Sequence, residues 1–336
     1  MDWNTGITAG YYAAYVDPAT WRATERFEIT GGSISNSAED LRSNASLECK
    51  GYPQGTERWI RVYLDARQDD EAEHIAMFTG LATSPALEVN GRIISNTVDC
   101  YSVLKPAQDV LLDRGWYAPA DADGGNVIEH LLSVTPAPVV VDDNAPTLTN
   151  AIIAEDGENN LSMVDKVLTA IGWRLTLDGD GTIHITPKAE EASASYDALE
   201  NDAVEPKISV TRDWYGCPNV FRAVNDDLSG VARDDAEDSP LSTVNRGREV
   251  WAEETSCDLN NDETIAEYAA RRLKEKQQVG TSAKYDRRYN PDLNVTDLIR
   301  LHYPGQGLDG LYEITSQSIE LGYGAKTSEE VVYSDR

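Results

Sequence analysis

The sequence predicts a mainly β protein with an inserted α+β segment, and three features of its 336 residues indicate this. Short runs with β-type alternation recur between turn residues through the first hundred residues. The same pattern returns from Lys207 and continues to the C-terminus. Between the two lies a segment with helical periodicity and a different charge composition. We therefore expect two β-barrel-type domains of similar fold plus an inserted α+β domain.

The first β-barrel domain is expected to span residues 1–112. Its clearest strand is RWIRVYLDAR at residues 58–67, in which apolar side chains occupy one face and mostly polar or aromatic ones the other. Asn90-Gly91 separates two apolar runs, and this dipeptide is a strong signal for a tight hairpin turn. A short helix, AQDVLLDRG, follows Lys105 and Pro106.

The inserted acidic α+β domain is expected to span residues 113–200. Residues 115–205 hold 17 acidic and 3 basic residues, a net charge of −14 out of −29 for the whole chain. Apolar residues at helical spacing predict helices over residues 124–134 and 161–171. The run WRLTLDGDGTIHITP at residues 173–187 predicts a hairpin.

The second β-barrel-type domain is expected to span residues 201–336. Runs such as KISVTRDWYG and GLYEITSQSIELGYG are typical of strands, and one helix is predicted over residues 263–278 with an acidic first turn and a basic last turn. In an alternative arrangement, the early strands of this segment complete the first barrel.

Motifs that carry chemistry are absent from the sequence. It has no GxSxG elbow, HExxH, Walker A or Rossmann GxGxxG. Asp178-Gly179-Asp180-Gly181 offers alternating oxygen ligands for calcium, but it lacks the third acidic ligand and the closing Glu, so a hairpin turn is favoured. Acidic pairs such as Glu253-Glu254 are expected by chance among 58 acids. We therefore predict no enzyme activity, no catalytic residues, no cofactor and no metal.

Histidines and cysteines give no site either. The four histidines are scattered without ligand spacing, and the four cysteines form no CxxC pair. Ordinary buried thiols are the simplest interpretation.

The start of the chain, MDWNTG, lacks the basic and apolar regions of a signal peptide, and no apolar run approaches the length of about 18 residues that a membrane-spanning helix needs. We expect a chain that is made in the cytoplasm and does not insert into a membrane. Its acidic net charge argues against binding to nucleic acid through a basic surface.

Four arginines are candidates for a subunit interface. Arg246 and Arg248 flank Gly247, and Arg287 and Arg288 lie between two tyrosines. Because a guanidinium pairs well with carboxylates, these side chains are expected to meet acids inside the chain or across a subunit contact. Solvated turns are the alternative.

The order of elements, with phrases such as TGLATSP, CYSVLKPA, GWRLTLDGDGTIHITP and SPLSTVNRGREVW, resembles the hub proteins of phage tails and baseplates. These are relatives of the T-even baseplate hub, including siphophage tail hubs and the N-terminal region of tail-associated proteins. The resemblance implies two barrels of one fold per chain and a homotrimer whose six barrel-like units dock on a hexameric tail tube.

The same resemblance implies the partners and the location. The partners would be the tail tube protein, distal tail or baseplate proteins, the tape-measure protein and tip or receptor-binding proteins. The chain would be part of the virion, assembled in the bacterial host cytoplasm, with DNA passing through its ring without sequence-specific contact. Acidic residues are then expected to line the channel, because they repel phosphate.

A function of another class is a carbohydrate-binding or glycan-degrading β-sandwich. It is supported by the seven Trp and 16 Tyr, which could stack on sugars, and by the paired acids. Glycan binding or turnover by a monomer would favour it, whereas a ring-forming trimer inert to sugars would favour the hub.

Overall fold

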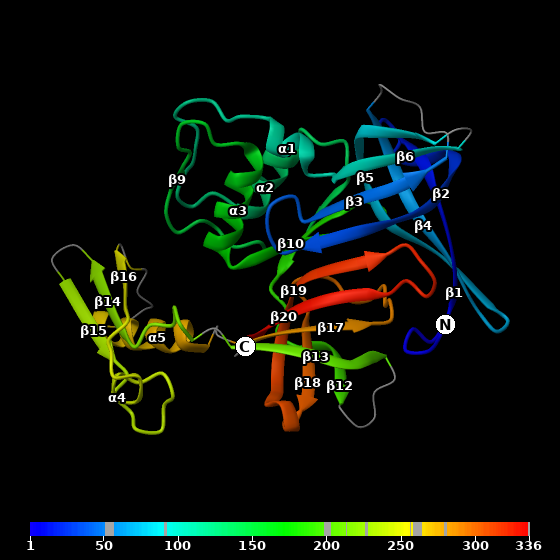
Figure 1. The fold of residues 1–336 in the computed structure, drawn as a ribbon. Coiled ribbons are helices and arrows are strands. Elements are labelled where there is room, and N and C mark those ends of the chain that lie inside the picture. The colour runs from blue at the N-terminus through cyan, green and yellow to red at the C-terminus, as the bar shows by residue number, and fades with distance from the viewer. Residues whose placement is uncertain are drawn as a thin grey trace.

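A computed structural model describes residues 1–50, 57–90, 93–197, 203–212, 214–225, 228–255, 257, 264–278 and 281–334. The chain is mainly β, with one large, mostly antiparallel sheet, three small sheets and few helices, so the predicted fold class is confirmed. Figure 1 shows β1–β6 at the upper right, the helical insert beside them, the C-terminal strands of the large sheet below both, and a small separate unit at the lower left. The Asn90-Gly91 turn involves residue 91, which lies outside the described residues.

The first six strands form a closed barrel. They are β1 (Thr8–Asp17), β2 (Arg22–Ser37), β3 (Ser43–Cys49), β4 (Arg58–Gln68), β5 (Glu71–Asn90) and β6 (Ile93–Ser102). Their order is β1-β4-β5-β6-β3-β2, and β2 pairs again with β1, which closes the ring of strands. Closure satisfies the backbone hydrogen bonds that an edge strand would leave open.

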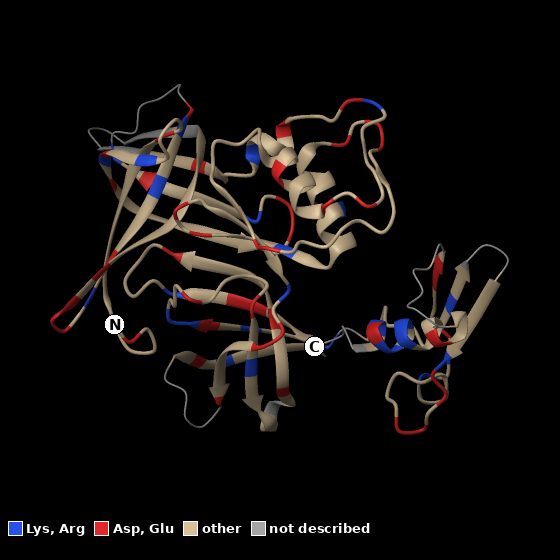
Figure 2. Cartoon of the chain, turned by 180° about the vertical axis from the view of Figure 1, so that it is seen from behind, with Lys and Arg blue, Asp and Glu red and all other residues tan. Residues whose placement is uncertain are grey.

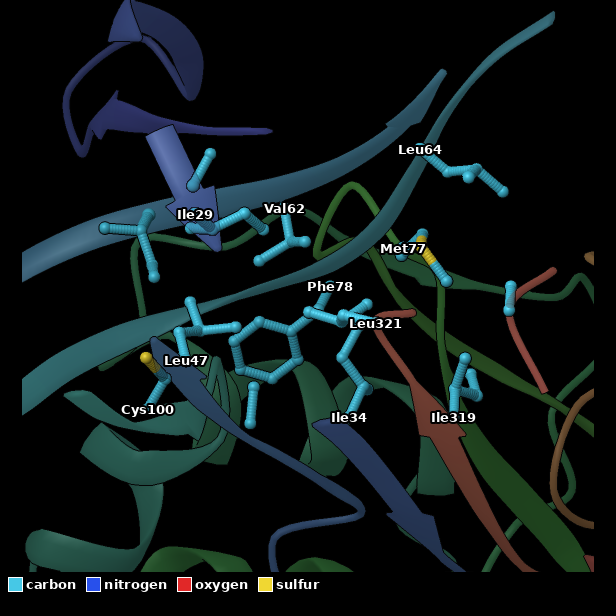
Figure 3. Packing of buried hydrophobic residues seen from close by; sticks show 14 of the residues in the cluster. Ile29, Ile34, Leu47, Val62, Leu64, Met77, Phe78, Cys100, Ile319 and Leu321 are labelled. Atoms are coloured by element: carbon cyan, nitrogen blue, oxygen red, sulfur yellow. The ribbon is translucent and has the colours of Figure 1, made fainter. Parts of the chain in front are cut away.

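Apolar side chains at every second position fill this barrel. In β4, Ile60, Val62 and Leu64 are fully buried, as the period-2 pattern predicts. They pack in one cluster with residues from the other strands, among them Phe78, and with Ile319 from the C-terminal part of the chain (Figure 3). The core of the first barrel therefore includes residues that arrive from the second β region.

The second β region contains six strands around its own core. They are β12 (Ala192–Asp197), β13 (Val204–Arg212), β17 (Thr281–Arg287), β18 (Leu298–Tyr303), β19 (Leu308–Glu320) and β20 (Thr327–Ser334), with a 3-10 turn at Pro304–Gln306. β19 pairs with β20, β20 with β17 and β17 with β13, while β18 joins β19 to β12. Tyr285, Tyr312 and Ile314 are among the buried residues of this core.

β19 also pairs antiparallel with β2, with Ile319 opposite Ile34. This pairing merges both β regions into one 12-stranded sheet. Among the described residues, β13 pairs with β17, and the first barrel closes on its own strands. No described strand from residue 201 onward is thus needed to complete the first barrel. The domain ranges 1–112, 113–200 and 201–336, and the similarity of the two barrels, stay predictions.

The insert folds as an α+β unit over the junction of the two β regions. Its elements are α1 (Lys105–Asp109), β7 (Tyr117–Ala118), α2 (Gly124–Leu132), β8 (Val139–Val141), β9 (Ile152–Ile153), α3 (Asn160–Ile171), β10 (Trp173–Leu177) and β11 (Ile183–Pro187). The helices predicted at residues 124–134 and 161–171 and the predicted hairpin are present to within two residues. The short helix predicted as AQDVLLDRG instead includes Lys105 and Pro106 and ends at Asp109, because the backbone is extended at Val110. The α3 helix begins at an Asn159 cap and ends at Gly172, whose φ of 70° suits a residue without a Cβ.

A further unit, which we call the small α/β unit, comprises residues 214–278. It contains β14 (Val220–Asn225), β15 (Leu228–Arg233), α4 (Thr243–Arg246), β16 (Trp251–Thr255) and α5 (Ile265–Gln278). Its strands form a separate sheet in the order β15-β14-β16, and α5 covers one face with Tyr268, Ala269 and Leu273 against Phe221 and Ala223.

The sequence predicts that these strands belong to the second barrel-type domain, but they form a sheet separate from the large sheet. Alternation shows that a strand buries one face, but it does not show which layer covers that face. Here the covering layer is the local helix α5. Among the described residues, no helix is long and apolar enough to cross a membrane.

The barrel core predicts how the thiols react. Burial raises the pKa of Cys49 to about 12 and raises that of Cys100 further, and both side chains are about 1% exposed. Since the thiolate is the reactive form, neither should be alkylated at pH 8 while the protein is folded. Mass spectrometry after iodoacetamide treatment should show both unmodified, whereas the urea-unfolded chain should be alkylated at all four cysteines. Rapid modification of Cys49 or Cys100 in the folded protein would contradict this packing.

Candidate functional site at the junction of barrels and insert

A cavity of about 210 Å³ lies where the two β regions and the insert meet. Residues 75–79 of β5 form one wall, Asp178, Gly179 and Gly181 of the β10–β11 turn form another, and the loop at residues 289–294 forms a third. Arg287 and Gln317 of the second β region also line it. This junction sets how the three parts of the chain are oriented.

The β10–β11 turn docks on the first barrel through its backbone. Thr79 Oγ1 donates a hydrogen bond to the Gly179 carbonyl at 2.8 Å, and Arg61 Nη2 donates to the Asp180 carbonyl at 2.6 Å. Trp21 Nε1 donates to the same Asp180 carbonyl at 3.0 Å. The predicted hairpin is confirmed, and its turn is a docking element. Arg61 lies on the face of its strand opposite the apolar one, and it is only 9% exposed because it reaches this turn.

Two more polar contacts hold the insert. Arg174 Nη1 of β10 donates to Asp297 Oδ1 at 2.8 Å and to the Thr296 carbonyl at 2.9 Å. Arg42, in the β2–β3 loop, forms an ion pair with Asp165 of α3. Burial raises the pKa of Asp165, and the Arg42 charge opposes that rise.

Each of the three contacts includes a residue other than glycine in the left-handed region. The φ angles are 55° at Trp21, 60° at Arg42 and 74° at Thr296. Such angles are uncommon for residues with a Cβ and least favourable for a β-branched one. The contacts with the insert therefore coincide with local backbone strain, which the surrounding packing must offset.

A buried ion pair forms part of the second β region beside the cavity. Arg287 Nη2 lies 2.5 Å from Glu329 Oε1, and the side chains are 1% and 0% exposed. Tyr285 OH donates to Glu329 Oε2 and Gln317 Nε2 to Glu329 Oε1, both at 2.8 Å. Burial lowers the pKa of Arg287, but the Glu329 carboxylate more than offsets this and the pKa is raised. The Arg287 guanidinium thus remains charged across the neutral range.

The structure separates the four predicted interface arginines. Arg287 is unavailable to another subunit, because its side chain is buried against Glu329 of the same chain, and its assignment to an interface is corrected here. Arg288 is exposed, next to Gly6 at the start of the chain. Neither lies in the small α/β unit, where Arg246 and Arg248 are found.

Arg246 and Arg248 bind backbone carbonyls, and neither pairs with a carboxylate among the described residues. Arg246 donates to the carbonyls of Cys217 and Trp214, at 2.6 and 2.9 Å, and Arg248 donates to that of Tyr215 at 3.2 Å. The described residues therefore give these two arginines no acidic partner inside the chain. An acidic partner on another subunit remains a prediction.

A cluster of aromatic, histidine and carboxylate side chains on the first barrel was not predicted from the sequence. His74 Nδ1 lies 2.5 Å from Asp65 Oδ1, its Nε2 contacts Tyr12 OH, and its ring stacks on Tyr63. Cross-strand register brings these residues together, and no spacing in the sequence signals it. Burial raises the pKa of Tyr12, so its phenol stays protonated at neutral pH and is not an activated nucleophile. Within the described part of the chain, no group of three His, Cys, Asp or Glu could hold a metal.

Comparison with known proteins was informative at the level of fold. No protein-family model matches the sequence, and no curated protein is similar to it in sequence. The structure is similar to the tail protein from Neisseria meningitidis MC58, with a TM-score of 0.72 and 14% identity over 97% of each chain. It is also similar to the 43 kDa tail protein of prophage MuSo2 from Shewanella oneidensis, with a TM-score of 0.69 and 15% identity over 98% of this chain and 96% of that one.

A third similar structure is the prophage tail protein gp18 from Listeria monocytogenes EGD-e, with a TM-score of 0.57 and 11% identity. The match covers 99% of this chain and 95% of that one. The chain therefore has the fold of phage tail proteins along nearly its whole length. The resemblance predicted from the sequence is confirmed at this level.

The docked turn predicts the effect of Gly179→Ala. A Cβ at this position would lie 1.9 Å from the Ala76 carbonyl oxygen, so the turn would have to move away from β5. The moved turn would also weaken the hydrogen bonds from Thr79 and Arg61. We expect a loss of about 1–3 kcal/mol in the free energy of unfolding, measured by urea denaturation.

Gly216→Ala is the matched control, because an ideal Cβ there meets nothing within 4 Å. It should change the free energy of unfolding by less than about 0.5 kcal/mol. Equal stability of Gly179→Ala and the wild type would show that the turn does not dock as described.

The buried ion pair predicts strong destabilisation when one charge is removed. Glu329→Gln leaves the Arg287 charge buried without a counter-charge, and we expect a loss of about 3–5 kcal/mol on urea denaturation. Arg287→Met combined with Glu329→Leu should recover much of this loss, because no lone charge then remains buried.

Glu330→Gln provides the comparison at the adjacent position. Glu330 pairs with Lys284 at 3.0 Å, and these side chains are 33% and 61% exposed. Removal of that surface pair should cost less than about 1 kcal/mol. A similar effect of Glu329→Gln and Glu330→Gln would refute the role given to the buried pair.

Proposed function

We propose that this protein is the structural hub of a bacteriophage tail tip or baseplate, in which three copies form a ring. The observation that carries the proposal is the joining of two β regions of one chain into a single 12-stranded sheet through β2 and β19. It is supported by the fold shared with tail proteins, over 97% of the tail protein from Neisseria meningitidis MC58 and 96% of the tail protein of prophage MuSo2.

In this proposal, each chain presents two barrel-like units, so three chains present six. A ring of six similar units matches a hexameric tail tube, whereas three copies of a single barrel would not. The rigid β2–β19 pairing keeps the two units of one chain at a fixed spacing. The partners on either side would be the tail tube protein and the tape-measure protein, and distal tail, baseplate, tip or receptor-binding proteins.

The role is structural, with DNA passing through the ring. The acidic chain, with a net charge of −29, would repel the phosphate backbone and leave the duplex free to slide. In the cluster of Tyr12, His74 and Asp65, the raised pKa of Tyr12 keeps its phenol protonated at neutral pH, so this group is no nucleophile for hydrolysis. We assign the chain no catalytic step and place it in the virion.

Assembly tests the proposal directly. Light scattering of the purified chain at micromolar concentration should give the mass of three copies, or should do so once tail tube protein from the same particle is added. Negative-stain images of the mixture should show a ring that caps one end of the tube. A chain that stays monomeric and does not bind the tube would refute the hub assignment, whereas glycan binding by the monomer would favour the carbohydrate-binding alternative.

A further inference from the structure

An exposed surface on the small α/β unit combines aromatic rings with arginines. We call it the aromatic–arginine patch, made of Trp214, Tyr215, Arg246 and Arg248. The two aromatic residues are 44% and 81% exposed, although rings of this size usually lie in cores or interfaces. The Arg248 guanidinium carbon lies 5.1 Å from the centre of the Tyr215 ring.

This patch is held in place before any partner binds. Arg246 Nη2 donates to the carbonyls of Trp214 and Tyr215 at 2.9 and 3.2 Å, and its Nη1 donates to Cys217. Asn219 Nδ2 donates to the Arg248 carbonyl at 2.9 Å. Because the loop is already ordered, binding would cost little conformational entropy. Rigid Trp, Tyr and Arg side chains are the residues that most often dominate protein interfaces.

A second exposed surface, on the insert, has the opposite charge. Tyr117 and Ile153 are cross-strand partners in the β7–β9 pair, 59% and 66% exposed, and Leu111 nearby is 64% exposed. Backbone bonds from Leu112 to Glu158 and from Ala154 to Trp116 bring their segments together.

Exposed acids surround these apolar side chains, and we call the whole the acid-rimmed patch. Its rim contains Asp113, Glu155 and Asp156, and the one basic residue there, Arg114, lies 3.5 Å from Asp156. Figure 2 shows red acidic segments on the outer loops of the insert, well separated from the small α/β unit of the same chain.

We propose that, in the ring, the aromatic–arginine patch of one copy binds the acid-rimmed patch of the next copy. The inference rests on the proposed function, since it supplies the contact between neighbouring hubs. The apolar side chains would be buried together, while Arg248 would pair with the acidic rim around Glu155. The two patches differ, so the contact is head to tail, and a head-to-tail contact closes into a ring of three when each copy is rotated by a third of a turn from the last.

A second copy fits better than an unrelated occupant, because both halves of the contact lie on this chain and have opposite charge. Two chains with a net charge of −29 repel one another, so association needs a locally positive surface. Residues 214–278 hold 14 Asp and Glu against 8 Lys and Arg, so the small α/β unit as a whole is acidic. The positive charge is local to the patch: Arg246 and Arg248 are two of those 8 residues, and their guanidinium groups meet only carbonyls and a ring among the described residues.

Charge reversal with rescue tests the contact. Arg248→Glu and Glu155→Arg, made singly in the full chain, should each raise the concentration at which the trimer dissociates by at least about tenfold. The variant with both changes should return to within about threefold of the wild type, because the ion pair is re-formed in the opposite sense. Dissociation would be followed by light scattering or sedimentation velocity over a range of concentrations, with tube protein added if the wild type needs it.

Lys188→Glu is the matched control, since this exposed residue lies outside both patches and its change alters the net charge by the same amount as Arg248→Glu. Circular dichroism melting would show that the variants are folded. If the wild type is trimeric and the single variants are equally so, or if the double variant is not rescued, the patch contact is overturned while the hub function stands. If the wild type never associates, alone or with the tube, both fail.

Discussion

The structure depends on the pairing between β2 and β19, which joins the two β regions into one sheet. The first half of β2 pairs with β1, and its second half lies between β3 and β19. The strand must therefore change direction midway. Gly32 permits this: its φ is 134°, and a Cβ would lie 2.2 Å from the Ser46 carbonyl oxygen of β3. A side chain at this point would push β2 off β3 and disturb the strand that links the two β regions.

Polar contacts in and around the junction then set the orientation of the other parts. Apolar packing alone allows small sliding movements between layers. Hydrogen bonds prevent such sliding, because Arg61 of the first barrel donates to the Asp180 carbonyl of the insert and Arg174 of the insert donates to the Thr296 carbonyl of the second β region. The buried pair of Arg287 and Glu329 ties β17 to β20 in the same region. Its charges are costly to bury, and hydrogen bonds from Tyr285 and Gln317 to the carboxylate offset part of that cost.

The excess of acid is distributed unevenly over the molecule. The insert takes the largest share, with −14 over residues 115–205, and carries exposed acids on its outer loops. By contrast, basic residues in the second β region are often paired within the chain, as in Lys284 with Glu330 and Lys326 with Asp286. The concentration of charge in one segment makes that segment suited to contacts with basic surfaces and leaves the sheet surface closer to neutral.

Much of the secondary structure was determined by the sequence alone, because period-2 and period-3.6 patterns act over a few residues. The strand at residues 58–67, the helix around Val164 and the hairpin with its Asp178–Gly181 turn were all predictable for this reason. Only the tertiary structure decided that β14 and β16 leave the large sheet to pack under α5, since alternation does not specify the covering layer. The tertiary structure also decided where the arginines lie: Arg287 is buried and Arg246 holds a loop through its carbonyls, although both are predicted from the sequence to be interface residues. Whether a guanidinium meets Glu329, a carbonyl or solvent depends on residues about 30 to 40 positions away in the chain, and that long-range register is set by the fold as a whole.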